Sequence, residues 1–314
     1  MAEDGWKYDE MHMELTTACN FRCGFCPSVE LQRPQSRLDF ELIQGILNDC
    51  RNHRLTKRVA FHLLGEALLY PQCMEVLELC RRLEMHTRLV TNGSLYNEEK
   101  YRQLYELIDI LDISCRTADD MELQAVQKPL TFEQYLEMVV AAVKLRAALP
   151  SSRTRVRIRL FISTKTWPTL KTLCGRLDVA PAFLLNADQG KIQPNQEFRP
   201  KPWLSILCEQ EQDWRYIENV YPSRFGNCDE YENSFSILSD GAVTSCCWDA
   251  HGENAMGNLR HSTLPEILEN EASRRFRAAF RRHICPTEKC RKCTARPTWV
   301  RSVVYQALSL LNLR

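Results

Sequence analysis

The most constraining feature of this 314-residue chain is a short loop that carries three cysteines, Cys19, Cys23 and Cys26. The loop follows residues 11–17, whose alternating character predicts a short β-strand. In an α/β fold, chemistry is usually placed in the loop that leaves the carboxyl end of a parallel strand. Three thiolates there could bind three irons of a [4Fe–4S] cluster and leave the fourth iron open to another ligand. Zinc fits less well, because the loop lacks the paired Cys-x2-Cys knuckles of structural zinc sites.

The composition bears on where such a protein works and what it binds. The polar, acidic first residues do not resemble a secretory signal, so the 15 cysteines of the chain are not expected to form disulfides. We therefore expect a cytoplasmic protein that uses its cysteines for metal binding. No run of apolar residues is long enough for a transmembrane helix. The formal net charge of +1 gives no indication of a nucleic-acid-binding protein.

The spacing Cys-x3-Cys-x2-Cys, with Phe25 directly before the last cysteine, resembles the radical S-adenosylmethionine (SAM) superfamily. The resemblance implies that Cys19, Cys23 and Cys26 ligate a [4Fe–4S] cluster whose open iron chelates SAM, and that Phe25 lies beside the adenine. In that superfamily, reductive cleavage of SAM gives a 5′-deoxyadenosyl radical that abstracts a hydrogen atom from the substrate. An electron donor of the flavodoxin or ferredoxin type is implied as well.

Gly65 and Glu66 end a buried strand, where the superfamily has a Gly-Gly-Glu-Pro-like element that holds the SAM amino group. Leu64 and Ala67 replace the first glycine and the proline of that element. An ordinary strand-to-helix turn with an acidic residue remains the alternative. The resemblance implies further SAM contacts from Thr91, Asn92, Ser114 and Arg159. Arg157 could take the place of Arg159, or both could line a solvated strand face.

The predicted strands and helices alternate from residue 11 to about residue 190. This order predicts a parallel sheet covered by helices through right-handed crossovers. Five or six such units fit the α/β fold that the resemblance implies, a partial (β/α)6 barrel over residues 1–195. Proline, glutamine and asparagine cluster near residues 186–203, and we expect a linker over residues 196–225.

A second cysteine group lies late in the chain. Cys228 precedes a predicted hairpin with a Ser-Asp-Gly turn, Cys246 ends the hairpin, and Cys290-x2-Cys293 follows a predicted helix at residues 263–281. This layout resembles the SPASM/twitch extension of radical SAM enzymes, and the single-cluster twitch form fits best. It implies a small hairpin-plus-helix domain, residues 226–297, with an auxiliary [4Fe–4S] cluster on these four cysteines. Cys285 could substitute for one ligand, and a structural zinc site is the alternative.

Two residues beside Cys246 are candidates for catalysis. Cys247 is either a packed thiol or a donor that returns a hydrogen atom to a substrate radical, and Asp249 is either a general base or a turn cap. The residues between Ser273 and Arg301 include ten basic side chains and one acid, which suits a phosphorylated substrate or a solvated helix face. Residues 298–314 predict an amphipathic helix that packs on the barrel or on a partner.

We interpret the chain as a radical SAM oxidoreductase that acts on a carbohydrate-like or aminocyclitol substrate, as the resemblance to twitch-type dehydrogenases implies. The expected reaction is a two-electron alcohol dehydrogenation in which the auxiliary cluster accepts the second electron. Three alternatives stay open. They are epimerisation with Cys247 as hydrogen donor, modification of a peptide by a SPASM-type maturase, and a non-enzymatic iron–sulfur or zinc scaffold.

Overall fold

The structure is a computed structural model that describes residues 5–115, 123, 130–161, 166–179, 195–209 and 222–293. The predicted C-terminal helix at residues 298–314 lies outside these ranges. None of the described helices is long and apolar enough to cross a membrane.

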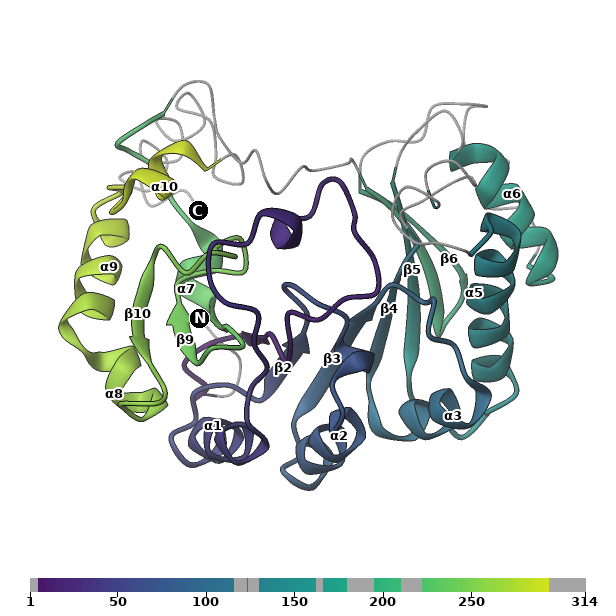
Figure 1. Ribbon diagram of the computed structural model, residues 1–314, viewed down its shortest axis with the longest axis horizontal. Coiled ribbons are helices and arrows are strands. Elements are labelled where there is room, and N and C mark those ends of the chain that lie inside the picture. The colour runs from purple at the N-terminus through teal and green to yellow at the C-terminus, as the bar shows by residue number, and fades with distance from the viewer. Residues whose placement is uncertain are drawn as a thin grey trace.

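In the described chain, ten strands form one open sheet whose two edges do not meet (Figure 1). Six neighbouring strands run parallel and make the partial barrel: β1 (Glu10–Met13), β2 (Arg58–Phe61), β3 (His86–Thr91), β4 (Ile110–Ser114), β5 (Arg155–Phe161) and β7 (Leu204–Glu209). Helices cover the outer face of the strands: α1 (Phe40–Asn52), α2 (Cys73–Arg82), α3 (Glu98–Leu107), α5 (Phe132–Ala147) and α6 (Thr166–Arg176). The predicted α/β class and the partial (β/α)6 barrel are confirmed.

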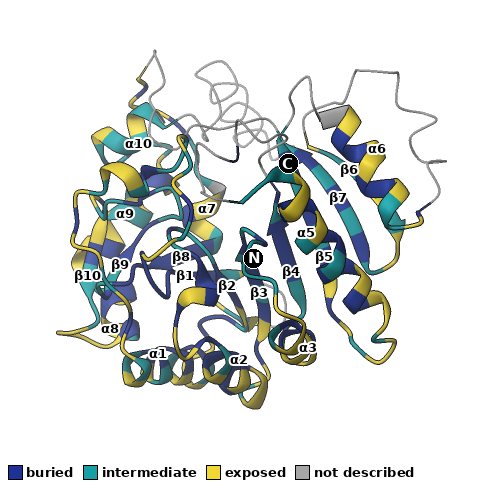
Figure 2. Ribbon diagram, turned by 45° about the vertical axis from the view of Figure 1, so that its right-hand side comes forward, coloured by how far each residue is buried: buried dark blue, intermediate teal, exposed yellow. Residues whose placement is uncertain are grey.

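The period-two pattern of the strands separates the core from the barrel interior. On β1, Met11 and Met13 are fully buried in the apolar core, while Glu10 and His12 occupy the alternate positions. On β5, Val156, Ile158 and Leu160 enter the same core and leave the arginines between them on the inner face. Figure 2 shows the resulting band of buried residues along the strands. The inner face of the barrel is therefore polar, which prepares it for a ligand.

The C-terminal segment extends the barrel sheet. Strand β8 (Ser234–Ile237) pairs in parallel with β1, in the register Met11 to Phe235. Strands β9 (Ala242–Thr244) and β10 (Ala255–Asn258) continue the sheet antiparallel. The remaining elements of this segment are α7 (Asp229–Asn233), α8 (Leu264–Glu269), α9 (Glu271–Arg281) and α10 (Glu288–Lys292).

Two details differ from the sequence-based expectation. Within residues 196–225, expected to be a linker, β6 (Gln196–Lys201) and β7 form an antiparallel pair, because β5 offers β7 a free edge. The helix expected at residues 263–281 is two helices, α8 and α9. Asn270 ends α8 in an extended conformation, and its side chain accepts a hydrogen bond from Ser273 N at 2.9 Å, which starts α9.

A buried carboxylate joins the barrel to this C-terminal extension. Glu14 follows β1, is fully buried, and accepts hydrogen bonds from Nη2 of Arg33 at 2.6 Å on both oxygens. It also accepts from Ser239 Oγ at 2.5 Å, from Ser239 N at 3.1 Å and from Leu64 N at 3.3 Å. One side chain thus holds the cysteine loop, the end of β2 and the β8–β9 turn together.

Glu14→Gln should destabilise the fold strongly, because it leaves the charge of Arg33 buried and without its ionic partner. Breaking a buried pair in this way costs about 3–5 kcal/mol. Unfolding by urea under anaerobic conditions measures the change, with Glu98→Gln as the control. Glu98 is exposed and paired with Arg102, so its loss should cost no more than about 1 kcal/mol. Equal losses for the two variants would show that Glu14 does not have this role.

Candidate active site

The loop that follows β1 holds three thiols at the mouth of the barrel. A bridge between Thr16 and Arg37 closes the loop at its base, and Cys26 N donates to Cys23 O at 3.0 Å inside it. The short 3-10 helix η2 (Pro27–Glu30) begins directly after Cys26. Desolvation raises the pKa of Cys19 to about 11, so without a metal this thiol stays protonated.

One cavity of about 280 Å³ collects all the residues predicted to hold SAM and its cluster, together with Cys247. Three elements bring them there: the cysteine loop, the ends of β2 to β5, and the segment after β9. Arg157 is not among the described residues that line it. The predicted residues along its wall are Cys19, Cys23, Phe25, Cys26, Gly65, Glu66, Thr91, Asn92, Ser114, Arg159 and Cys247.

Gly65 lets the end of β2 approach the cysteine loop. Its φ angle is +77°, and a Cβ at this position would lie 1.9 Å from the carbonyl oxygen of Thr16. The next residue, Glu66, donates its N–H to Ala18 O at 2.8 Å. Only glycine combines this backbone conformation with so close a contact. The glycine therefore fixes the distance between the two loops.

Glu66 is a buried carboxylate at the edge of this cavity. It accepts from Asn92 N at 2.7 Å and from Leu68 N at 3.2 Å, and so also caps the 3-10 helix η3 (Ala67–Leu69). Burial raises its pKa above the ordinary value, and the hydrogen bonds from Asn92, Thr91 and Leu68 oppose this shift. The residue thus combines the turn-capping arrangement with a place on the cavity wall.

Two polar residues that sequence reasoning missed tie the cysteine loop to the end of β3. Asn92 donates to Asn20 Oδ1 at 2.9 Å, and Asn20 donates to Ser94 Oγ at 2.8 Å. The backbone N–H of Ser94 completes the network on Asn92 Oδ1 at 2.9 Å. The only feature of the sequence that could have indicated this network was the position of Asn20 inside the cysteine motif.

The inner face of the barrel carries charges that neutralise one another across the strands. Arg159 lines the cavity and donates to both carboxylate oxygens of Glu209, at 2.9 and 2.8 Å. Arg157 makes the same kind of pair with the fully buried Asp112, at 3.0 and 2.5 Å. Because such bidentate pairs hold the guanidinium plane, they give the cavity a rigid polar wall.

His62 is a third residue that sequence reasoning missed. It lines the cavity just beyond β2, and its Nε2 lies 2.7 Å from Nδ1 of His12. Burial, with the charges of His12, Arg88 and Arg159, lowers the pKa of His62 well below its ordinary value, so the imidazole stays neutral. The sequence did contain a hint, because His62 lies two residues after Ala60 and the alternation of β2 therefore places both on the inner face.

The four late cysteines gather on one side of the C-terminal segment. Cys228 precedes α7, Cys246 follows β9, and Cys290 and Cys293 belong to α10 and its end. Burial raises the pKa of Cys228 to about 12, and the nearby thiols of Cys290 and Cys293 add to the shift. The pKa of Cys246 is raised by burial and then by Cys247 and Cys228. Cys285 is fully buried.

The spacing of both thiol groups suits a cluster better than a single ion. Four sulfurs around one zinc, each at about 2.3 Å, would lie about 3.8 Å apart. Among the described residues, no three of the predicted cluster cysteines bring their sulfurs within 4.8 Å of one another. A polynuclear iron–sulfur cluster spreads its ligands more widely. The thiols of each site are also near neighbours, as Cys19 is of Cys26 and Cys228 is of Cys290 and Cys293, so their type and number fit [4Fe–4S] clusters.

The two candidate catalytic residues, Cys247 and Asp249, have different surroundings. Cys247 and the neighbouring Trp248 line the cavity, and so bring the C-terminal segment to the cysteine loop. Asp249 is fully buried and is not among the described lining residues. Its carboxylate accepts from Thr244 Oγ1, from Glu253 N at 3.0 Å and from Asn254 N at 2.9 Å, which is the arrangement of a turn cap.

Gly65→Ala should disturb the cavity through the backbone. The positive φ angle alone costs a residue with a Cβ about 1–3 kcal/mol, and the contact with Thr16 O adds to this. Gly45→Ala in α1 is the control, since nothing lies within 4 Å of its Cβ position and it should stabilise the helix by about 0.5–1 kcal/mol. Thermal unfolding separates the two, and a neutral Gly65→Ala variant would contradict the geometry.

Comparison with known proteins supports the assignment of iron–sulfur clusters to the two cysteine groups. Residues 13–150 match the family model of the radical SAM superfamily, and residues 228–294 match that of SPASM, an iron–sulfur cluster-binding domain. A tungsten-containing aldehyde ferredoxin oxidoreductase cofactor-modifying protein of Pyrococcus furiosus is 22% identical over 317 residues, which cover 91% of this chain and 87% of that protein.

Two solved structures share the fold. BtrN in complex with AdoMet and 2-DOIA superposes with a TM-score of 0.59 at 15% identity, over 94% of each chain. SuiB of Streptococcus suis bound to the precursor peptide SuiA gives a TM-score of 0.58 at 14% identity, over 84% of this chain and 65% of that one. The matched families assign SAM and a [4Fe–4S] cluster to the barrel and an auxiliary iron–sulfur cluster to the C-terminal segment. The chain thus carries a radical SAM superfamily domain over residues 13–150, followed by a SPASM iron–sulfur domain over residues 228–294.

Proposed function

We propose that the protein removes two electrons from an alcohol carbon of a small carbohydrate-like or aminocyclitol molecule. The observation that carries this proposal is that one cavity is bordered both by the cysteine loop and by Cys247 and Trp248 of the C-terminal segment. A substrate in that cavity lies between the two groups that would take its hydrogen atom and its second electron.

The chemistry divides between the cofactors and the chain. When bound, SAM and its cluster supply the acceptor for a hydrogen atom, and the auxiliary cluster supplies the acceptor for one electron. We assign the holding of SAM to Phe25, Glu66 and Asn92, which line the cavity beside the cluster cysteines. His62 and Arg88 give the same cavity polar groups that can bind substrate hydroxyls.

The oxidation of an alcohol to a carbonyl compound releases one hydrogen atom, one electron and one proton. The proton leaves the hydroxyl group and needs an acceptor. The Asp249 carboxylate is occupied by its turn, and the Glu66 carboxylate by two backbone N–H groups. His62 has one ring nitrogen bonded to His12, which leaves the other for the substrate hydroxyl. We assign His62 to orient that hydroxyl.

The cavity has a volume of about 280 Å³ and must take the substrate together with SAM, so the space that it leaves favours a small substrate. The Pyrococcus furiosus relative is named for the modification of a cofactor, which also suits a substrate that is not a peptide. Peptide modification remains the second candidate, because SuiB binds a precursor peptide on the same fold.

A phosphorylated substrate receives less support. Basic side chains of the 274–292 segment are paired with neighbouring acids, as in Arg275 with Glu271 and Lys292 with Glu288. These pairs lie on helix surfaces at a spacing of four residues, which is the arrangement of a solvated helix face.

The iron content tests the two clusters. The anaerobically reconstituted protein should contain about eight irons per chain and cleave SAM to 5′-deoxyadenosine with a reduced flavodoxin or ferredoxin. A variant with alanine at Cys19, Cys23 and Cys26 should keep about four irons and lose the cleavage. About four irons in the wild type and none in the variant would contradict the assignment of an auxiliary cluster. A protein that binds iron but never cleaves SAM would be a scaffold.

The mass of the product separates dehydrogenation from epimerisation. With polyol and aminocyclitol substrates in D2O, we expect a product lighter by two hydrogen atoms and without deuterium on carbon. An epimerase that uses the Cys247 thiol would instead give an isomer of the substrate that carries deuterium from the exchanged thiol. In that case Cys247→Ala would stop product formation while SAM was still consumed, and the dehydrogenase proposal would be abandoned.

A further inference from the structure

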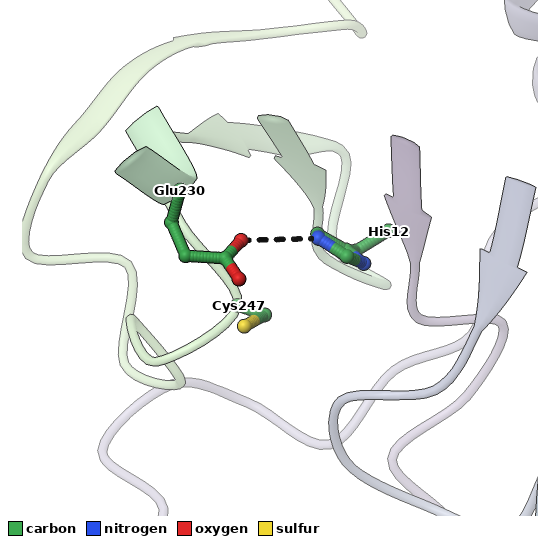
Figure 3. Close-up of side chains that lie close together, drawn as sticks. All are labelled: His12, Glu230 and Cys247. Atoms are coloured by element: carbon green, nitrogen blue, oxygen red, sulfur yellow. Dashed lines mark ion pairs between the residues drawn. The ribbon is translucent and has the colours of Figure 1, made fainter. Parts of the chain in front are cut away.

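Three side chains beside the cavity bring metal-binding atoms together. His12 comes from β1, Glu230 from α7 and Cys247 from the loop after β9, and Figure 3 shows the three lying close together. A ring nitrogen of His12, a carboxylate oxygen of Glu230 and the sulfur of Cys247 all lie within 4.8 Å of one another. In the described chain this is the single group of three such donors that lie this close together.

One of these atoms is a buried nitrogen without a hydrogen bond. His12 is only 5% exposed, and its Nε2 makes no hydrogen bond among the described residues. Oε2 of Glu230 lies 3.6 Å away, which is close enough for the ion pair drawn in Figure 3 but beyond a hydrogen bond. Buried polar atoms almost always make a hydrogen bond, so a nitrogen without one is a candidate for binding a ligand.

The spacing fits a single small cation. Two ligands that each lie about 2.0–2.1 Å from a tetrahedral Zn²⁺ are separated by about 3.3–3.4 Å, close to the observed 3.6 Å between His12 and Glu230. Imidazole nitrogen, carboxylate oxygen and thiolate sulfur are the three donor types that zinc uses in proteins. We propose that His12, Glu230 and Cys247 bind a divalent cation, for which Zn²⁺ is best suited, separate from the two iron–sulfur clusters.

The surroundings support these ligands. A metal-bound histidine usually donates its other N–H to a fixed acceptor, and His12 Nδ1 lies 2.7 Å from His62 Nε2. Glu230 Oε2 accepts from Ser234 Oγ at 2.9 Å, which orients the carboxylate. The positive charge of Arg88, which would oppose a cation, is paired with Glu10 at 2.9 Å. The charges of a thiolate and a carboxylate balance a divalent ion.

The site would serve the reaction proposed above, and this part of the inference rests on that function. Three protein ligands leave one position of a tetrahedral zinc open. Cys247 is also on the cavity wall, so the ion would border the substrate. Contact with such an ion lowers the pKa of a hydroxyl group, so that its proton can pass to solvent water without Asp249 or Glu66, which are already occupied. A thiolate that binds a metal has no S–H bond, so an occupied site also excludes Cys247 as a hydrogen-atom donor.

Metal content tests the site without an activity assay. The reconstituted protein is incubated with Zn²⁺ alone, desalted anaerobically, and analysed for zinc, iron and sulfide by mass spectrometry. We expect about one zinc per chain in addition to the iron of the clusters. His12→Ala and Glu230→Gln should lose this zinc and keep their iron. The matched controls are His53→Ala, an exposed residue after α1, and Glu232→Gln, an exposed residue on the same helix as Glu230.

X-ray absorption at the zinc edge keeps the test decisive if a variant does not fold. In the wild-type protein we expect one sulfur at about 2.3 Å and nitrogen or oxygen ligands at about 2.0–2.1 Å. No retained zinc, zinc retained equally by both ligand variants, or a zinc with four sulfur ligands would each overturn the proposal. Dehydrogenation without zinc would overturn the role of the ion in the reaction and leave the proposed function standing, whereas bound zinc without dehydrogenation would overturn the proposed function alone.

Discussion

The buried carboxylate of Glu14 is the interaction on which the arrangement of the site depends. It follows β1 directly and is held by Arg33, Ser239 and the backbone of Leu64. These partners belong to the three segments that carry the cysteine loop, the Gly65–Glu66 turn and the β8–β9 hairpin. A buried charge requires complete pairing, so the three segments have one low-energy arrangement relative to one another. The cavity is the space that this arrangement leaves.

The polar interior of the barrel follows from the same need for pairing. Arg157 with Asp112 and Arg159 with Glu209 join neighbouring strands on the inner face, and each guanidinium is held by two hydrogen bonds. Most charged side chains of the interior are therefore held in ion pairs and are not free to bind a ligand. His12 stands out against this background, since its Nε2 is buried and makes no hydrogen bond among the described residues.

The parts of the molecule that could be predicted from the sequence are those in which residues close together in the chain form a motif. The cysteine motifs, Gly65 and Glu66, and the Thr91-Asn92 turn could be found because a short loop brings its own residues together whatever the rest of the chain does. The alternation of strands and helices gave the α/β class in the same way. The strand pair β6–β7 was missed, because its segment has a loop-like composition and is held as sheet by the edge of β5.

The group of His12, His62 and Glu230 could not be found in the sequence for a related reason. These residues are separated by 50 positions or more, and they meet only through the parallel register of β1 with β2 and with β8. A histidine on an inward strand position looks the same in sequence as one that packs in a core. Only the register decides which histidine faces which carboxylate, and no local pattern records it.

The pairing of β1 with β8 also has a consequence for electron transfer. Cys19 follows β1 and Cys246 follows β9 of one continuous sheet, so the sheet sets how far apart these two cysteines lie. The rate of electron tunnelling falls steeply with the distance between donor and acceptor. A distance that is fixed by backbone hydrogen bonds therefore keeps this rate constant. A slip of the β1–β8 register would alter the distance between the two cysteine groups, and with it their electronic coupling.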